Sequence, residues 1–562
     1  MSFCRLNRVG DPCRIASKPI PKLARRPLAI HPLVSCLHCV LRKGITLASI
    51  CCALGFPAEL RAGAKHNQQA QEFFDSTNMA VFHVELDDFE AGQLARRPKA
   101  YVGGRVRIGE QVFENVGIRL KGSGTFQPIS EHPSLAVKFN WKESNQRFSG
   151  LAKLFLENSA QDASKMCKFV ANAVFADGGI PAPRITHARV FLNERDLGIY
   201  VVAEAINKDF LKHHFGDSSG NMYEAFFSDV GRGLKQDNGP LSDQWDLREL
   251  AAAAAIRDEA VRKQKLSQLL DVDEFLDFLA IETILANWDG YAYHQNNYRL
   301  YHDPVSGRIK IIPHDLDNTF SESGMSLMPP RNAILTSALL ATQQDRDAFR
   351  ERVARLFPRV LDAQHVQRRV GTCVARLSQG ASPEEISRIQ RQSELLEKRV
   401  QERWNHFGQE LAGNHPPTPA FDSGGMARLT GWSAKTDWNN AIVKAVVDED
   451  TPVLRIDASQ NYCFGSWRLP LWLPPGRYRL EGEARTRGVV GLPSQTGSGA
   501  GVRVLGGRRG SGIQGNCGHW AQVRHDFVVQ EDCEWVELIA ELRATSGTAW
   551  FDPETLRLIR LR

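Results

Sequence analysis

The stretch NWDGYAYHQNNYRLYHDPVSGRIKIIPHDLDNTF, residues 287–320, decides how this part of the chain folds. Two runs within it, YRLYHD and RIKIIPHD, have the character of short strands, and the residues from Pro304 to Gly307 suit a turn between them. We therefore predict a β-hairpin. Because a hairpin brings its two ends together, Asn297 and Asp315 should lie close in space.

The same stretch is rich in groups that hold cations or move protons. Asp289 follows an apolar helical pattern and could accept or orient the proton of an attacking hydroxyl. Asn297, Asp315 and Asp317 offer amide and carboxylate oxygens, which Mg²⁺ prefers when nucleotide phosphates complete its octahedron. Taken singly, Asp289-Gly290 is typical of a turn, and Asp-Leu-Asp before Asn-Thr is also typical of a helix N-cap or a calcium loop.

Two lysines upstream stand in an alternating pattern of strands between Ala80 and about Phe155. Lys121 begins a small glycine-containing turn, KGSGT, and Lys138 lies inside the apolar run SLAVKFNW. A lysine in an apolar strand costs free energy unless it is paired, so Lys138 is a candidate for binding phosphate. A solvated lysine on an edge strand is the plainer alternative.

The rest of the chain divides by pattern. Residues 162–177 have helical periodicity with Asp162 as a candidate N-cap, and further helices are predicted over 247–270, 271–288, 345–380 and 383–411. The pattern after residue 425 returns to short strands separated by turn residues. The predicted divisions are a basic leader over 1–64, a mixed domain over 80–411, a linker over 412–424 and an all-β sandwich over 425–562.

The charge of the chain is concentrated in its leader. The 562 residues carry a formal charge of +6, but residues 1–64 hold ten Lys and Arg against two acidic residues. The remainder is slightly acidic, so nucleic acid is not a predicted partner. Arg42-Lys43, the apolar run from Ile45 to Phe56 and Ala62-Gly63-Ala64 have the order of a secretory signal. We expect a secreted or cell-envelope protein without a transmembrane span.

Several ordered blocks resemble one known family. They are VGIRLKGSGTF with SLAVKFN, KLFLENSAQDASKMCKFVANAVFADGGIPAPR, VFLNERDLGIYVVAEAINKDFLKHHFG with GNMYEA, and NWDGYAYHQNNYRLY with IIPHDLDNTF. Between about Ala80 and Phe407 the chain resembles the spore coat protein H (CotH) kinase family of atypical secreted protein kinases. The resemblance implies an α+β, bilobal, divergent protein-kinase-like domain with a β-rich N-lobe and a helical C-lobe. It implies ATP and Mg²⁺ (or Mn²⁺) as cofactors.

The resemblance also assigns roles, carried over position by position. Asp289 would be catalytic, Lys138 with Lys121 would bind nucleotide phosphates, Glu204 would lie near the adenine, and Asn297, Asp315 and Asp317 would hold the metal. The acceptor would be Ser or Thr of an exported or surface protein.

The C-terminal segments GRYRLEGEART and AWFDPETLRLIRL resemble jelly rolls of the carbohydrate-binding-module type. A glycan or cell-surface ligand is therefore expected for the sandwich. Two alternatives to the kinase remain. One is a non-catalytic surface adhesin on the same fold, and the other is an Asp-x-Asp glycosyltransferase, which predicts a parallel α/β nucleotide-binding fold.

Overall fold

The computed structural model describes residues 58–240, 242–436, 441–448, 451–458, 463–492, 497–507, 509–530 and 534–561. Most of the predicted leader therefore lies outside the described residues. Its last residues, including the Ala62-Gly63-Ala64 motif, belong to helix α3 (Ala58–Asp75). Residues 65–562 form one compact unit. Within it Ala70 and Phe74 of α3 are buried, so the ordered fold begins before Ala80, where the mixed domain was predicted to start.

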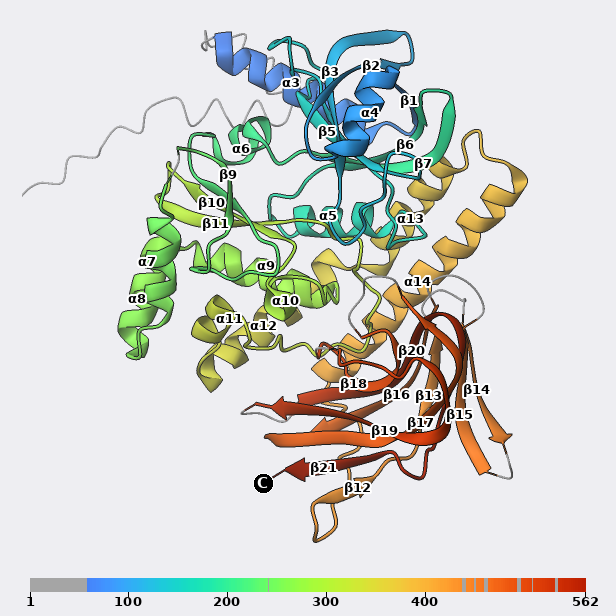
Figure 1. Cartoon of the computed structure of the whole chain (residues 1–562). Coiled ribbons are helices and arrows are strands. Elements are labelled where there is room, and N and C mark those ends of the chain that lie inside the picture. Colours follow the sequence, from blue (N-terminus) through green and yellow to red (C-terminus); the bar gives the residue numbers. More distant parts are fainter. Residues whose placement is uncertain are drawn as a thin grey trace, which may run out of the picture. The chain divides into compact units, whose positions relative to one another are not determined.

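The strand-rich region is a closed barrel. Its strands, most of which are labelled in Figure 1, are β1 (Ala80–Glu85), β2 (Val102–Ile108), β3 (Gln111–Lys121), β4 (Ser134–Lys138), β5 (Lys153–Glu157), β6 (Ile185–Leu192) and β7 (Arg195–Glu204). Their order around the barrel is β1-β2-β3-β4-β5-β7-β6. Alternate residues such as Leu135, Val137, Leu154 and Leu156 fill the interior. The parallel pairing of β1 with β6 closes the barrel, whereas the other neighbouring strands run antiparallel.

A helical region contains a second sheet and follows the barrel, except that its helix α5 lies between β5 and β6 in the chain. The helices are α5 (Cys167–Asp177), α6 (Lys208–Phe215), α7 (Trp245–Ala254), α8 (Glu259–Leu269), α9 (Val272–Ile284), α10 (Tyr291–His294), α11 (Ile334–Leu339), α12 (Gln343–Val360), α13 (Ala363–Leu377) and α14 (Pro383–Leu411). The sheet has the order β11-β10-β8-β9, with β8 (Met222–Glu224), β9 (Lys235–Asn238), β10 (Tyr298–Asp303) and β11 (Arg308–Pro313). Helix α9 is buried from Phe278 to Ile284 and packs on α5 and α12.

Capping residues explain where the helices differ from the sequence prediction. The segment 247–270 is two helices rather than one, because Asp258 accepts a hydrogen bond from Val261 N and starts α8. The segment 345–380 is divided in the same way by Asp362, the N-cap of α13. Helix α5 begins at Cys167 instead of near Asp162, whose carboxylate accepts a hydrogen bond of 2.9 Å from Cys167 N. Helix α14 begins at Pro383 as predicted, and Ser382 and Glu385 form a capping box at its start.

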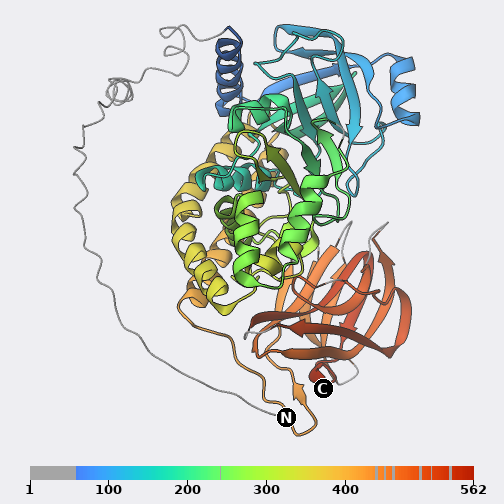
Figure 2. The ribbon, with the colours of Figure 1, turned by 90° about the vertical axis from the view of Figure 1, so that its left-hand side faces the viewer.

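The C-terminal sandwich, defined here as β12–β21, is built around one long strand. Its strands are β12 (Met426–Arg428), β13 (Ser433–Thr436), β14 (Ala441–Asp448), β15 (Thr451–Ala458), β16 (Cys463–Leu473), β17 (Gly476–Gly491), β18 (Gly499–Val504), β19 (Gly515–Val529), β20 (Glu534–Phe551) and β21 (Arg557–Leu561). The first half of β20 pairs with β16 and β18, and its second half pairs with β15 and β17. Two facing layers result, with one apolar core (Figure 2). The jelly-roll connection stays a prediction.

The whole is a mixed structure of helices and largely antiparallel sheets, in the predicted order of strands, then helices, then strands. The parallel α/β sheet that a nucleotide-sugar glycosyltransferase would require is not found in the described ranges. None of the helices in the described part of the chain combines the length and apolar character needed to cross a membrane.

Candidate active site

A tight turn after α9 presents Asp289. Glu282 in the last turns of α9 is buried, and its Oε1 accepts hydrogen bonds from Asn287 Nδ2 and from Tyr291 N, both at 3.1 Å. A Cβ atom on Gly290 would lie only 2.1 Å from this same oxygen, so glycine is required for the close approach. The buried carboxyl group thus fixes the turn on both sides of Asp289.

The Asp289 carboxylate is surrounded by side-chain amides. Asn297 Nδ2 donates to Oδ2 at 2.9 Å, Asn296 Nδ2 donates to Oδ1 at 3.3 Å, and Asn318 Nδ2 lies 3.5 Å from Oδ2. Burial raises the pKa of Asp289 above its ordinary value, although the hydrogen bonds from the asparagines act in the opposite direction. A carboxylate held this way is oriented and is a better proton acceptor than a solvated one.

The predicted hairpin is present and brings its ends together. β10 and β11 pair antiparallel from Tyr298 opposite Pro313 to Asp303 opposite Arg308. His314 N donates to Asn297 O at 3.0 Å, which confirms that the segments carrying Asn297 and Asp315 are adjacent. Asn297 and Asp315 both have left-handed backbone conformations, with φ of 54° and 51°. Such conformations are tolerated by Asn and Asp and concentrate at functional sites.

Asp315 takes part in a chain of alternating charges that joins the barrel to the helical region. Lys121 Nζ at the end of β3 lies 2.5 Å from Glu157 Oε1 at the end of β5. Lys168 Nζ on α5 lies 2.6 Å from Glu157 Oε2 and also pairs with Asp315 Oδ1. Lys168 and Glu157 are both buried. Two lysines and two carboxylates, carried by β3, β5, α5 and the loop after β11, therefore lie in contact.

The pKa values in this cluster follow from burial and from neighbouring charge. For Glu157, burial acts to raise the pKa, but Lys121 and Lys168 outweigh it and hold the pKa at about 2. The same lysines hold the pKa of Asp315 far below its ordinary value despite burial. Burial and the negative charge of Asp315 raise the pKa of Asp317 well above its usual range. The cluster thus holds two ionised carboxylates, Glu157 and Asp315, beside Asp317, for which Lys168 only partly offsets burial.

Sequence reasoning missed Glu157 and Lys168. A signal existed for both, since each is a charged residue adjoining an apolar run, KLFL for Glu157 and FVANAVF for Lys168. Burying such groups is costly unless they are paired. The sequence could have shown that each needs a partner, but not that they are partners of each other.

Lys138 lies on the same face of the sheet as Lys121 but farther along. It stands opposite Gly117 on β3 and Lys153 on β5, and its Nζ is 5.9 Å from the centre of the Tyr101 ring. Four residues of β4 separate its row from that of Lys121, a distance of roughly 13 Å. Lys138 therefore shares the sheet face with the charge cluster without joining it.

Glu204 is not brought to this cluster. It stands opposite Leu154, whose side chain lies in the barrel core, whereas Glu157 is three residues farther along β5 and so points to the other face. The Glu204 carboxylate accepts from Arg184 Nη2 at 2.5 Å and from Nε at 2.9 Å. The predicted place of Glu204 near adenine stays a prediction, and the contacts given by the structure are those of a buried ion pair.

The donor set fits a hard divalent cation that also binds phosphates. No three Cys, His, Asp or Glu side chains in the described ranges gather closely enough to form a metal centre by themselves. Asp315 and Asp317 would supply carboxylate oxygens and Asn297 an amide oxygen to such a cation. Mg²⁺ is commonly held by one or two carboxylates, with nucleotide phosphates and water as its remaining ligands.

A known protein family matches the part of the chain that holds this site. The model of the CotH kinase protein family matches residues 118–409, just over half of the chain, and that range includes every candidate site residue described above. The chain belongs to the CotH kinase protein family.

Members of the CotH family with curated names are distant from this chain. The inner spore coat protein H of Bacillus subtilis (strain 168) is 24% identical over 188 residues, which are 31% of this chain and 51% of that protein. Invasin CotH3 of Rhizopus delemar is 22% identical over 314 residues, 50% of this chain and 49% of that protein. The chain thus spans about half the length of these relatives.

Among solved structures, that of the Helicobacter pylori proinflammatory kinase CtkA is 11% identical and covers 50% of this chain and 95% of its own, with a TM-score of 0.26.

Proposed function

We propose that this protein is a kinase that transfers the terminal phosphoryl group of ATP, with Mg²⁺ or Mn²⁺, to a serine or threonine hydroxyl of an exported or surface protein. The observation that carries the proposal is the meeting of Asp289, Asn297 and Asp315 around one hairpin, with Lys168 beside them. A catalytic carboxylate, metal ligands and cations for phosphate are the parts that phosphoryl transfer needs.

Each group has a distinct task in this proposal. Asp289 accepts the proton of the acceptor hydroxyl, whose oxygen forms the new bond to the γ-phosphorus while the bond to the bridging oxygen of ADP breaks. Asn297, Asp315 and Asp317 hold the metal, which neutralises phosphate charge when bound. Lys121 and Lys168 lie close enough to the metal ligands to bind phosphate oxygens, and Lys138 extends the cationic face along the sheet. The barrel would act as the N-lobe and the helical region as the C-lobe.

The setting of the reaction is also a proposal. The family relatives named above are a spore coat protein and an invasin, so a surface or secreted location suits the signal-like order of residues 42–64. The C-terminal sandwich would bind a glycan or another cell-surface ligand. An adhesin without catalysis is the second candidate, favoured by the name of the invasin relative.

The two candidates differ in a direct assay. The protein is incubated with labelled ATP, Mg²⁺ or Mn²⁺ and candidate acceptor proteins, beside Asp289→Asn and Asp315→Asn variants. The kinase should label an acceptor, and each variant should lose at least ~10²-fold of that labelling. Equal labelling by the wild type and both variants would contradict the roles proposed for Asp289 and Asp315. An adhesin would bind no nucleotide, and its ligand binding would survive both substitutions.

A further inference from the structure

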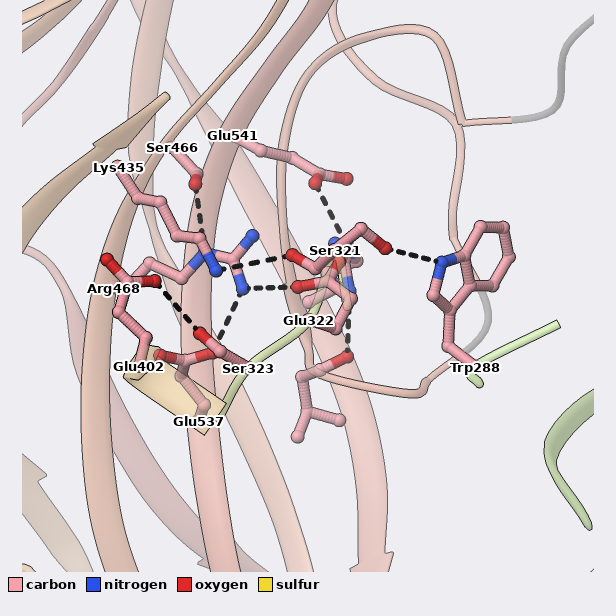
Figure 3. Close-up of polar contacts among 12 residues, drawn as sticks. Trp288, Ser321, Glu322, Ser323, Glu402, Lys435, Ser466, Arg468, Glu537 and Glu541 are labelled. Atoms are coloured by element: carbon pink, nitrogen blue, oxygen red, sulfur yellow. Dashed lines mark hydrogen bonds and ion pairs between the residues drawn. The ribbon is translucent and has the colours of Figure 1, made fainter. Parts of the chain in front are cut away.

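The loop that follows the Asp-Leu-Asp motif at residues 315–317 forms ion pairs with the C-terminal sandwich. Glu322 in this loop is 6% exposed, and its carboxylate lies 2.7 Å from Arg468 Nη1 on β16 (Figure 3). The same carboxylate lies 3.4 Å from Arg503 Nη2 on β18. Arg468 also pairs with Glu537 at 2.9 Å, and Arg503 pairs with Glu541 at 3.0 Å. A residue from the CotH-family region thus completes a buried charge network of the sandwich.

The helical region holds the same loop from the other side. The fully buried Arg403 of α14 donates to Ser323 O at 3.0 Å and to the Met325 carbonyl. Its Nη2 also donates to Thr283 O in α9 at 2.5 Å. The loop is therefore fixed between α9, which carries the turn of Asp289, and the arginines of the sandwich.

A short path of contacts joins this junction to the candidate active site. Trp288 precedes Asp289, and its Nε1 donates to Ser321 Oγ at 3.0 Å (Figure 3). Ser321 Oγ donates in turn to Asn318 O at 3.0 Å, and Asn318 is one of the amides around Asp289. From the sandwich, Lys435 Nζ lies 3.3 Å from Ser321 O.

The sandwich also covers Trp288 itself. The Arg509 guanidinium lies over its indole ring, 5.3 Å from the ring centre. The residue directly before the candidate catalytic carboxylate is therefore contacted both by the loop and by the sandwich.

A domain tethered only to bring the protein to its ligand would not need such a junction. Burying one carboxylate and two guanidinium groups is unfavourable unless they are paired, and a satisfied buried polar network favours one arrangement over others. Glu322, which pairs with the sandwich, lies only five residues after Asp317, in the loop that continues directly from the proposed metal-ligand motif.

We propose that Glu322 is a positioning residue through which the C-terminal sandwich holds the segment from Asp315 to Ser321, so that the sandwich is a working part of the active site. The proposal rests on the proposed function for the role of that segment. It implies that ligand or partner binding that shifts β16 or β18 changes metal affinity at Asp315 and Asp317.

The test uses Glu322→Gln in the full chain and reads two quantities. Hydrogen–deuterium exchange is followed in peptides covering residues 315–325, and Mn²⁺ affinity is measured with ATP present. We expect faster exchange in that segment and about tenfold weaker Mn²⁺ binding, the size of a coupling of moderate strength. Melting temperature reports whether the variant is folded. If Glu322→Gln does not fold, Arg503→Lys, which keeps the positive charge but loses the forked contact, serves in its place.

The matched control is Asp526→Asn, which breaks the exposed ion pair with Arg479 inside the sandwich. It should change neither quantity. Unchanged exchange over residues 315–325 together with unchanged Mn²⁺ affinity in Glu322→Gln would overturn the proposal. If the wild type bound no Mn²⁺, the proposed function would fail, while the exchange measurement would still decide whether the junction holds the loop.

Discussion

Glu282 should make the stability of this protein fall as pH rises. Burial raises the pKa of its carboxyl group from 4.5 to about 8, since the nearest backbone and amide donors do not supply a full countercharge. The neutral acid is the buried form, so its contribution to stability is complete below about pH 4.5. That contribution is lost as pH rises toward 8, at about 1.4 kcal/mol per pH unit. Across the window the loss is on the order of 4 to 5 kcal/mol.

The substitution Glu282→Gln removes this dependence and keeps the geometry. A glutamine Oε1 can still accept from Asn287 Nδ2 and Tyr291 N, but the side chain cannot ionise. We expect the variant to match the wild type within about 1 kcal/mol near pH 4.5 and to exceed it in stability by several kcal/mol near pH 8. The turn carrying Asp289 should keep its conformation in both proteins.

The assay for Glu282 is urea unfolding followed by tryptophan fluorescence at several pH values, with wild type and variant compared at each. Other ionisable groups are common to both proteins, so the difference between the two curves isolates Glu282. Glu351→Gln, on the exposed face of α12, is the control and should show no pH-dependent difference. A difference between Glu282→Gln and wild type that stays constant from pH 4.5 to 8 would show that Glu282 is not a neutral buried acid in the folded protein.

Three further substitutions test the surroundings of the site. Lys168→Gln leaves Asp315 and Glu157 without their shared buried cation, so it should lower the free energy of unfolding by about 3 kcal/mol, part of which Mn²⁺ restores. The control is Lys310→Gln, which loses two carboxylate partners elsewhere and should show no stabilisation by Mn²⁺. Thermal shift assays with and without Mn²⁺ compare the two variants. Gly290→Ala places a methyl group against Glu282 and should lower phosphoryl transfer at least tenfold. In contrast, Gly371→Ala in α13, where nothing lies within 4 Å of the added carbon, should leave the transfer rate unchanged. Glu204→Gln should weaken the buried pair with Arg184 and lower the melting temperature, yet leave ATP affinity within about twofold; a large loss of ATP affinity would instead support its predicted place near adenine.

Local sequence signals predicted much of the site. Alternation and a Pro-to-Gly turn were enough to place Asn297 beside Asp315, because the covalent connection of a hairpin leaves few alternatives. The strand pair β6 and β7 has the same kind of short connection, and the long helix α14 carries a local start signal in Ser382 and Pro383. Each of these features depends on residues close together in the chain.

Features formed by residues far apart in the chain could not be predicted. Lys168 and Asp315 are 147 residues apart and meet only because α5 packs between β6 of the barrel and the helices α9 and α12. Glu322 and Arg503 are 181 residues apart, and nothing in either local pattern indicates the other. The face on which Glu204 lies depends on strand register, where a shift of one residue moves every side chain to the opposite side.

The central claim is that Asp289 acts on the acceptor hydroxyl while Asn297 and Asp315 hold the metal. The most direct measurement separates binding from transfer: ATP affinity in the presence of Mn²⁺ and single-turnover phosphoryl transfer are determined for Asp289→Asn and Asp315→Asn. Asp289→Asn should bind ATP within about threefold of wild type and lose at least ~10²-fold in transfer, whereas Asp315→Asn should lose both. Transfer by Asp289→Asn at the wild-type rate would contradict the account.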